Sequence, residues 1–340
     1  MTNTNYIYNE FIFRCLFFFL ISGLITLSTI KPEGFDHDYK QYLYLFELYK
    51  NSIDLGFGYE VEPLFIYLSR LVNFFNGGIV ALLFIYTAVA LICKCIFIKR
   101  CTKKTSQLVF FVFLYLVIFY PIHELTQIRI SLALGLLLWG SLQKNKIIFA
   151  MIMLLTMLSH YSLIPSVIFI SLFRYLNDKI VRTQVLAFIA LLCFVICLLL
   201  IFYMSRQTIK YDGTNMPFYF YFLHPYSLIM LFSLFYMRRY IKNHFYYQLL
   251  YILAMLYYFL FLSFLFLQSQ IAAFRFMEIA LFFMFILIFI INSSFKSSII
   301  KMLMLILVVT MFLYEHVIAI EPILNFDILH NSFSKMDTFQ

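Results

Sequence analysis

Charged side chains are scarce in this sequence. Asp, Glu, Lys and Arg make up 12% of the 340 residues, whereas they form about a quarter of a typical soluble domain. Hydrophobic residues reach 64%, and the mean hydropathy is +0.92. A soluble protein of this composition would lack a polar surface with which to face water. The composition therefore excludes a soluble globular protein and predicts that lipid is the solvent.

Two further absences concern the organisation of the chain. The sequence contains no internal repeat, no low-complexity tract and no linker, so we expect a single integral membrane domain over residues 1–340. The first apolar run, 11–30, is followed by no small-residue cleavage site and ends at Lys31. A secretory signal peptide carries such a site, so this run is predicted to be an uncleaved first transmembrane helix.

Cysteine is absent from the segments predicted to be external. All six cysteines fall in predicted spans or on the predicted cytoplasmic side: Cys15, Cys93, Cys95, Cys101, Cys193 and Cys197. Disulfides persist in oxidising compartments, so none is expected here. The cysteine spacing offers no metal-binding motif, and we expect neither a metal nor a cofactor.

Apolar runs of transmembrane length recur along the chain. A hydrocarbon core about 30 Å thick requires about 20 mostly apolar residues per helix. The sequence therefore predicts an all-α polytopic membrane protein with about eleven transmembrane helices. They fall near 11–30, 79–98, 106–121, 128–142, 147–160, 162–176, 185–203, 222–237, 247–267, 274–292 and 302–320. Pro165 lies in the sixth run, where we expect a broken or tilted helix.

A long external segment, residues 31–78, follows the first predicted helix. Residues 39–49 alternate aromatic and polar side chains at helical spacing, and residues 63–75 are apolar enough to lie in the membrane interface. We therefore expect interfacial helices within this segment.

The basic residues indicate an orientation, because Lys and Arg accumulate in the cytoplasmic loops of membrane proteins. With the amino terminus inside, 16 of the 25 basic residues fall on the cytoplasmic side and 9 on the outer side. The cytoplasmic ones are Arg14, Lys94, Lys99, Arg100, Lys103, Lys104, Lys144, Lys146, Arg174, Lys179, Arg182, Arg238, Arg239, Lys242, Lys296 and Lys301. They form short clusters between apolar runs, so the net charge of +9 does not indicate a nucleic acid partner.

One predicted hairpin carries ionisable residues at membrane depth, where such groups are costly and often functional. Arg129 lies fifteen residues before Lys144, and His160 lies fourteen residues after Lys146. At 1.5 Å per residue, both stand about 21–22 Å from the same cytoplasmic turn. The two side chains are therefore predicted to lie at one depth, just inside the outer boundary, with Glu124 above them.

The types of these side chains suggest a chemistry. A guanidinium binds the oxygens of a phosphate or diphosphate in pairs and stays charged. A histidine titrates near neutral pH and can accept or relay a proton. The alternative is structural: Arg129 extends to the interface and His160 caps a helix end.

Other basic residues allow two readings as well. Arg275 opens the tenth predicted span on the outer side, with Glu278 one turn below, and either binds an anion or forms a structural ion pair. Arg206 and Lys210 lie in a predicted external loop, where they either contact substrate or form a solvated surface.

Three stretches resemble the EpsG-type family of Wzy-like polysaccharide polymerases. The first is DHDYKQYLYLFELY followed by GYEVEPLFIYLSRL, the second is QIRISLALGLLLWG followed by LSHYSLIP, and the third is the late Arg275 at the start of a span. Together they cover about two-thirds of the chain in the order expected for that family.

The resemblance implies a membrane glycosyltransferase in the bacterial inner membrane, with its active site facing the periplasm or exterior. It would transfer an undecaprenyl-diphosphate-linked glycan chain onto a lipid-linked repeat unit, in a pathway with a flippase and a chain-length regulator. Arginines would stabilise the leaving diphosphate, which needs no metal, and His160 or a carboxylate would act as base. The predicted catalytic residues are Arg129, His160, Arg275 and Glu62; the predicted substrate-binding residues are Asp36, Asp38, Tyr39, Glu60, Glu124, Tyr161, Arg206 and Lys210.

Two other classes of protein remain open. A flippase or transporter of lipid-linked oligosaccharides would also carry intramembrane arginines, although an internal repeat would then be expected. An O-antigen ligase, or another membrane transferase such as an acyltransferase, is the enzymatic alternative. The ligase would share the donor and differ only in its acceptor.

The orientation can be tested by labelling single-cysteine variants with a reagent that does not cross the membrane. We expect Glu60, Asp212 and the tail after Glu321 to be labelled from outside, because the basic residues assign these segments to the outer face. Cysteines at Lys103 and Arg239 are expected to react only after the membrane is opened. Labelling of position 103 in intact cells would overturn this orientation.

Overall fold

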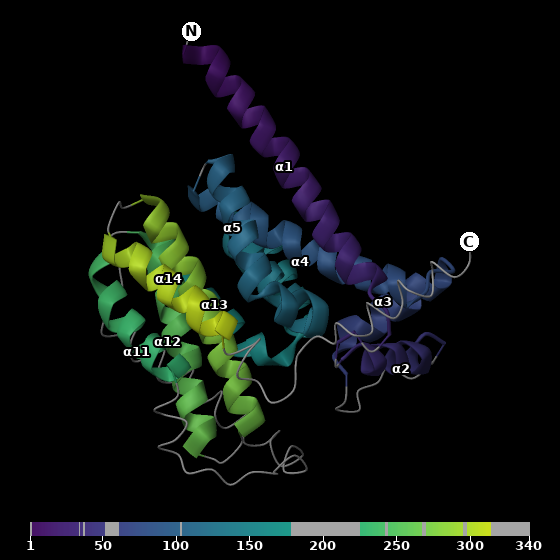
Figure 1. Cartoon of the computed structure of the whole chain (residues 1–340). Coiled ribbons are helices and arrows are strands. Elements are labelled where there is room, and N and C mark those ends of the chain that lie inside the picture. Colours follow the sequence, from purple (N-terminus) through teal and green to yellow (C-terminus); the bar gives the residue numbers. More distant parts are fainter. Residues whose placement is uncertain are drawn as a thin grey trace. The chain divides into compact units, whose positions relative to one another are not determined.

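The computed structural model describes residues 2–33, 35–36, 38–51, 61–102, 104–177, 225–241, 244–266, 270–294 and 298–313. Regular structure among these residues is helical, without a β-strand (Figure 1). The elements are α1 (Thr2–Ile30), α2 (Tyr39–Tyr49), α3 (Pro63–Phe74), α4 (Ile79–Thr102), α5 (Thr105–Ile118), η1 (Pro121–Thr126), α6 (Ile128–Ser141), α7 (Lys146–Ser159), η2 (Tyr161–Leu163), α8 (Ile164–Asn177), α11 (Pro225–Met237), η4 (Arg238–Tyr240), α12 (Phe245–Phe266), α13 (Gln270–Ser294) and α14 (Ser298–Leu313).

The all-helical class is confirmed, and the helices follow the predicted apolar runs closely. Each predicted span overlaps one of them except 185–203, which lies outside the described residues. Four of the described helices are long and apolar enough to cross a membrane: Glu10–Ile30 of α1, α4, Phe245–Leu265 of α12 and Ala272–Ser293 of α13. Five other apolar helices within the described residues are shorter. The count of eleven spans and the external location of 31–78 stay predictions.

The described helices fall into two compact units. The first contains α1 to η2, and the second contains α8 and α11 to α14. Within the second unit α13 is the most buried of the candidate spans and packs against α11 and α12. The organisation of the chain as a single domain stays a prediction.

The predicted hairpin of Arg129 and His160 is formed by α6 and α7, which pack against each other. Its turn ends at Asn145, whose side chain accepts hydrogen bonds from the backbone N–H groups of Ile147 and Ile148 at 2.8 and 3.3 Å. This side chain satisfies donors that a helix start otherwise leaves without partners. Pro165 lies in the first turn of α8, where a proline breaks no helical hydrogen bond.

The core of the first unit is apolar and is built by helices α2, α3, α4, α6 and α7. Phe65 of α3 and Tyr86 of α4 are fully buried, with ring centroids 6.1 Å apart. Helix α6 approaches α4 closely at Gly135, where a Cβ atom would lie 2.8 Å from the carbonyl oxygen of Ala90. Backbone atoms cannot move aside as a flexible side chain can, so glycine permits this approach.

We expect Gly135→Ala to lower the thermal stability of the purified protein. Overpacking of this kind costs about 1–3 kcal/mol. Gly23→Ala is the matched control, because its Cβ would meet nothing within 4 Å and alanine favours a helix over glycine. Unfolding temperatures in detergent would compare the two variants. Equal temperatures for both would show that the α4–α6 contact does not need the glycine.

Candidate functional site

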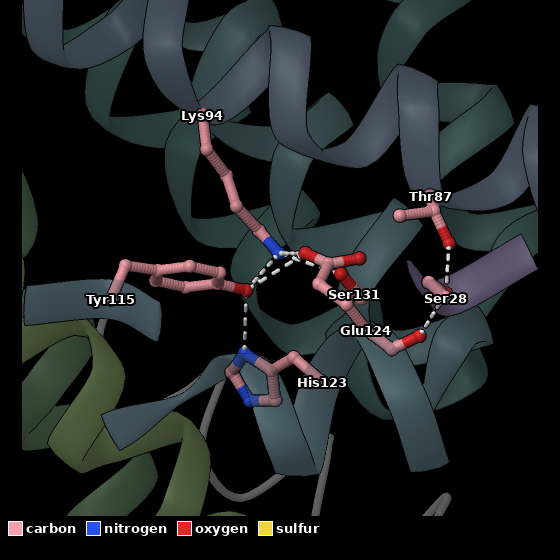
Figure 2. A network of polar contacts seen from close by, with 7 residues as sticks. All are labelled: Ser28, Thr87, Lys94, Tyr115, His123, Glu124 and Ser131. Atoms are coloured by element: carbon pink, nitrogen blue, oxygen red, sulfur yellow. Dashed lines mark hydrogen bonds and ion pairs between the residues drawn. The ribbon is translucent and has the colours of Figure 1, made fainter. Parts of the chain in front are cut away.

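A lysine and a glutamate form an ion pair deep inside the first unit (Figure 2). Nζ of Lys94, on α4, lies 2.7 Å from Oε1 of Glu124, on η1, and the two side chains are 1% and 0% exposed. The same Nζ donates to the hydroxyls of Tyr115 on α5 and Ser131 on α6, each at 2.6 Å. Tyr115 in turn donates to Glu124 at 2.8 Å. An ammonium has three N–H donors, and here all three have acceptors.

The backbone of η1 is held by polar side chains from two more directions. Ser28 of α1 donates to the carbonyl oxygen of Glu124 at 2.7 Å, and its hydroxyl lies 2.8 Å from that of Thr87 on α4. Lys31, directly after α1, donates to the carbonyl oxygen of Leu125. Because η1 leads directly into α6, these contacts fix the place where α6 begins.

Asp36 connects this region to α2. Its carboxylate lies 2.7 Å from Nζ of Lys31, with both side chains fully buried. Its Oδ1 accepts hydrogen bonds from the backbone N–H groups of Asp38 and Tyr39 at 3.0 and 2.9 Å. Burial lowers the pKa of Lys31, an effect that the neighbouring Asp36 opposes. Asp36, which the sequence suggested for substrate binding, thus secures the start of α2.

Arg129, Glu62 and His160 meet in a second polar cluster. Arg129 is the second residue of α6, Glu62 directly precedes α3, and His160 directly follows α7. The guanidinium forms an ion pair with Oε2 of Glu62, and Nε2 of His160 lies 3.6 Å from Oε1. The side chains retain 10% to 17% exposure. The cluster is therefore accessible, unlike the pair of Lys94.

The contacts of the imidazole define its tautomer. Nδ1 of His160 accepts the backbone N–H of Ser162 at 3.2 Å and lies 2.7 Å from the Ser162 hydroxyl. A neutral imidazole that accepts at Nδ1 carries its proton on Nε2. That proton faces Glu62 at a separation slightly longer than a hydrogen bond.

Aromatic rings surround the guanidinium of Arg129. Its Cζ lies 5.5 Å from the ring centroid of Tyr42 on α2 and 5.9 Å from that of Phe65 on α3. Such placement over ring faces stabilises a cation. Burial raises the pKa of Tyr42, which the charge of Arg129 opposes, so the phenol stays protonated at neutral pH. Nε of Arg129 is buried and has no hydrogen-bond partner among the described residues.

The other predicted site residues are placed differently. Tyr161 follows His160 and is 38% exposed, beside the cluster. Tyr39 is buried, with its ring 5.7 Å from Nζ of Lys31. Arg275 is exposed on α13 of the second unit, and no ion pair in the described structure joins it to Glu278. Predicted residues outside the described part of the chain are Glu60, Arg206 and Lys210.

The network around Lys94 differs from the sequence-based expectation. The orientation count assigned Lys94 to the cytoplasmic side and Glu124 to the outer side, yet the two form one buried pair. Glu124 was proposed to bind substrate, whereas its full burial favours a structural role. A lysine within the predicted span 79–98 was the available signal, since a charge at membrane depth requires a buried partner.

These features together define a polytopic, all-helical membrane protein with two clusters of ionisable side chains in its first unit. The sequence matches the EpsG family over residues 11–329, and the chain belongs to that family. The resemblance found in the sequence is thereby confirmed. Family membership supports a polymerase-type role in polysaccharide synthesis. No curated protein and no solved structure matches the chain.

Removing one partner of the buried pair is expected to destabilise the fold strongly. Lys94→Met leaves the carboxylate of Glu124 without a counter-charge, and such losses cost about 3–5 kcal/mol. The double variant Lys94→Met/Glu124→Gln is expected to recover most of this loss, because no isolated charge remains. Thermal unfolding in detergent measures both effects.

The matched control for this experiment is Lys50→Met. Lys50 forms an ion pair with Glu47 at the surface of α2, where pairs contribute about 0–1 kcal/mol. A double variant at the buried pair no more stable than the weaker single variant would argue that the hydrogen bonds, and not the charges, hold the network.

Proposed function

We propose that this protein is a polysaccharide polymerase. It transfers a glycan chain from a polyprenyl diphosphate carrier onto the next lipid-linked repeat unit at the outer face of the cytoplasmic membrane. The convergence of Arg129 and His160 on Glu62 is the observation that carries this proposal. The cluster combines a group for binding diphosphate with groups for handling a proton, and both remain accessible.

Arg129 has the role of binding the donor diphosphate. A guanidinium has five N–H donors in a planar fork that matches phosphate oxygens. Glu62 occupies one side of this fork in the present structure, and the diphosphate would take its place. When the bond from the sugar anomeric carbon to the diphosphate breaks, the electron pair leaves with the diphosphate. Positive charge fixed beforehand at that position stabilises the transition state.

Glu62 is the strongest candidate for the base. Its carboxylate accepts the proton of the acceptor hydroxyl as that oxygen bonds to the anomeric carbon. His160 is less suited to this task, because Nδ1 already accepts from Ser162 and Nε2 carries a proton that faces Glu62. The imidazole therefore orients the carboxylate and stabilises its charge. When Arg129 binds the diphosphate, its ion pair with Glu62 is lost and the carboxylate oxygens become free to accept the hydroxyl proton.

Residues outside the Arg129 cluster are proposed to bind the substrate as well. Arg275 is a second candidate for binding the diphosphate, and the exposed ring of Tyr161 is proposed to stack on a sugar ring. Arg206 and Lys210 are proposed to contact the lipid-linked glycan. A flippase and a ligase for the same lipid-linked donor remain the competing functions, and the products made by a deletion strain distinguish them.

The test uses ladder gels of surface polysaccharide from a deletion strain carrying variants of equal membrane abundance. We expect Arg129→Lys to abolish the ladder while one capped repeat unit remains, because a point charge does not reproduce the fork. Glu62→Gln is expected to lower the rate about 100- to 10,000-fold, the usual contribution of a general base. Loss of all capped material would instead indicate a flippase or ligase.

The exposed carboxylate of Glu47 provides the control, since Glu47→Gln makes the same chemical change away from the cluster. The double variant Arg129→Lys/Glu62→Gln is expected to be only slightly slower than the slower of the two single variants. Such non-additive rate losses are expected of residues that stabilise one transition state. Normal polymer length in Glu62→Gln would remove this carboxylate from the mechanism. Purified protein with lipid-linked repeat units gives the rates.

A further inference from the structure

A groove separate from the Arg129 cluster opens on the first unit, where α1 lies along α4 and α5 (Figure 1). Its cavity volume is about 480 Å³, within the range of about 300–1,000 Å³ that is usual for ligand sites. One wall is the face of α4 that carries Ile92, Cys95 and Ile96, and the opposite wall includes Phe17 and Ile21 of α1. These walls are apolar.

Two cations stand at one end of this groove. Lys99 and Arg100 lie one turn beyond Ile96 on the same face of α4, and the lining also includes Leu108 and Leu142. Lys99 donates to Thr105 and lies 3.9 Å from the carboxylate of Glu10. Arg100 is exposed and forms no ion pair with any acidic side chain in the described part of the chain. The groove thus has an apolar channel and a cationic end at which an anion could bind.

The lining of the groove divides into an apolar part and a charged end, as an amphiphile does. From Ile92 to Arg100 the helix advances about 12 Å. The apolar wall of the groove therefore extends along α4 for about this length away from the cations. Ile92 and Ile96 are 48% and 42% exposed, which leaves apolar surface for a chain to cover. A guanidinium at the end of such a channel binds phosphate oxygens in pairs.

We infer that this groove binds an anionic phospholipid, with an acyl chain along α4 and α1 and the phosphate at Arg100 and Lys99. The charge at the mouth favours a lipid with net negative charge over a zwitterionic one, because the phosphate of the latter already has a cationic partner. The C-terminal end of α4 belongs to the side that the basic residues predict to be cytoplasmic. Anionic lipids and basic residues attract each other there.

The inference can be tested with delipidated protein in detergent by native mass spectrometry. Phosphatidylglycerol is the probe, and phosphatidylcholine with the same acyl chains is the reference lipid. We expect phosphatidylglycerol to bind more tightly to the unmodified protein. Arg100→Gln is expected to weaken its binding about fivefold, the effect of one basic residue near a lipid surface, and to leave phosphatidylcholine binding unchanged.

Two more variants make the test specific. Lys146→Gln removes the same charge from an exposed position on α7, outside the groove, and is expected to change nothing. Ile96→Trp fills the channel and is expected to weaken both lipids while the unfolding temperature without lipid is preserved. Equal binding of the two lipids, an equal loss in Lys146→Gln, or tighter binding of a polyprenyl phosphate than of phosphatidylglycerol would each overturn the assignment. Turnover of lipid-linked glycan plays no part in these measurements.

Discussion

The buried pair of Lys94 and Glu124 joins four elements of the first unit. A charge in an apolar interior is tolerated only when its partners are all in place, because the desolvation cost is several kcal/mol for each ion. The three acceptors of Lys94 come from α5, η1 and α6, while the lysine itself is on α4. A rotation of α6 by one residue, about 100°, would remove Ser131 from the ammonium. The pair therefore sets the register of all four elements.

This register also sets the direction of Arg129. Ser131 follows Arg129 by two positions, so the two side chains point about 200° apart around α6. One side of the helix thus faces the buried network, and the other faces Glu62 and the rings of Tyr42 and Phe65. Helix α2, which carries Tyr42, is secured at its start by Asp36 and Lys31, and Lys31 also bonds to η1. The buried contacts therefore fix both α6, which carries Arg129, and α2, which carries Tyr42.

Helical rise alone was sufficient to predict much of this arrangement. The equal depth of Arg129 and His160 follows from counting residues on either side of one turn, and both side chains contact the same carboxylate. Glu62 entered through the family resemblance, because no periodic pattern connects residue 62 to residue 129. The partner of Lys94 could not be predicted, since the choice among acidic residues depends on how α5, η1 and α6 pack. The same holds for Asp36, whose hydrogen bonds to the backbone at the start of α2 depend on the path of the chain after α1.

The ion pairs of Lys94 and Arg129 differ in burial and in their hydrogen-bond partners. Lys94 uses each of its three donors and is sealed from solvent, so no anion can displace Glu124 without breaking the core. Arg129 has five donors, one of them without a partner among the described residues, and its cluster keeps some exposure. A diphosphate carries more negative charge than one carboxylate and offers more oxygens to the fork. Under the proposed function a diphosphate would therefore replace Glu62 at the guanidinium, and the released carboxylate would stay beside His160 to accept a proton from the acceptor hydroxyl.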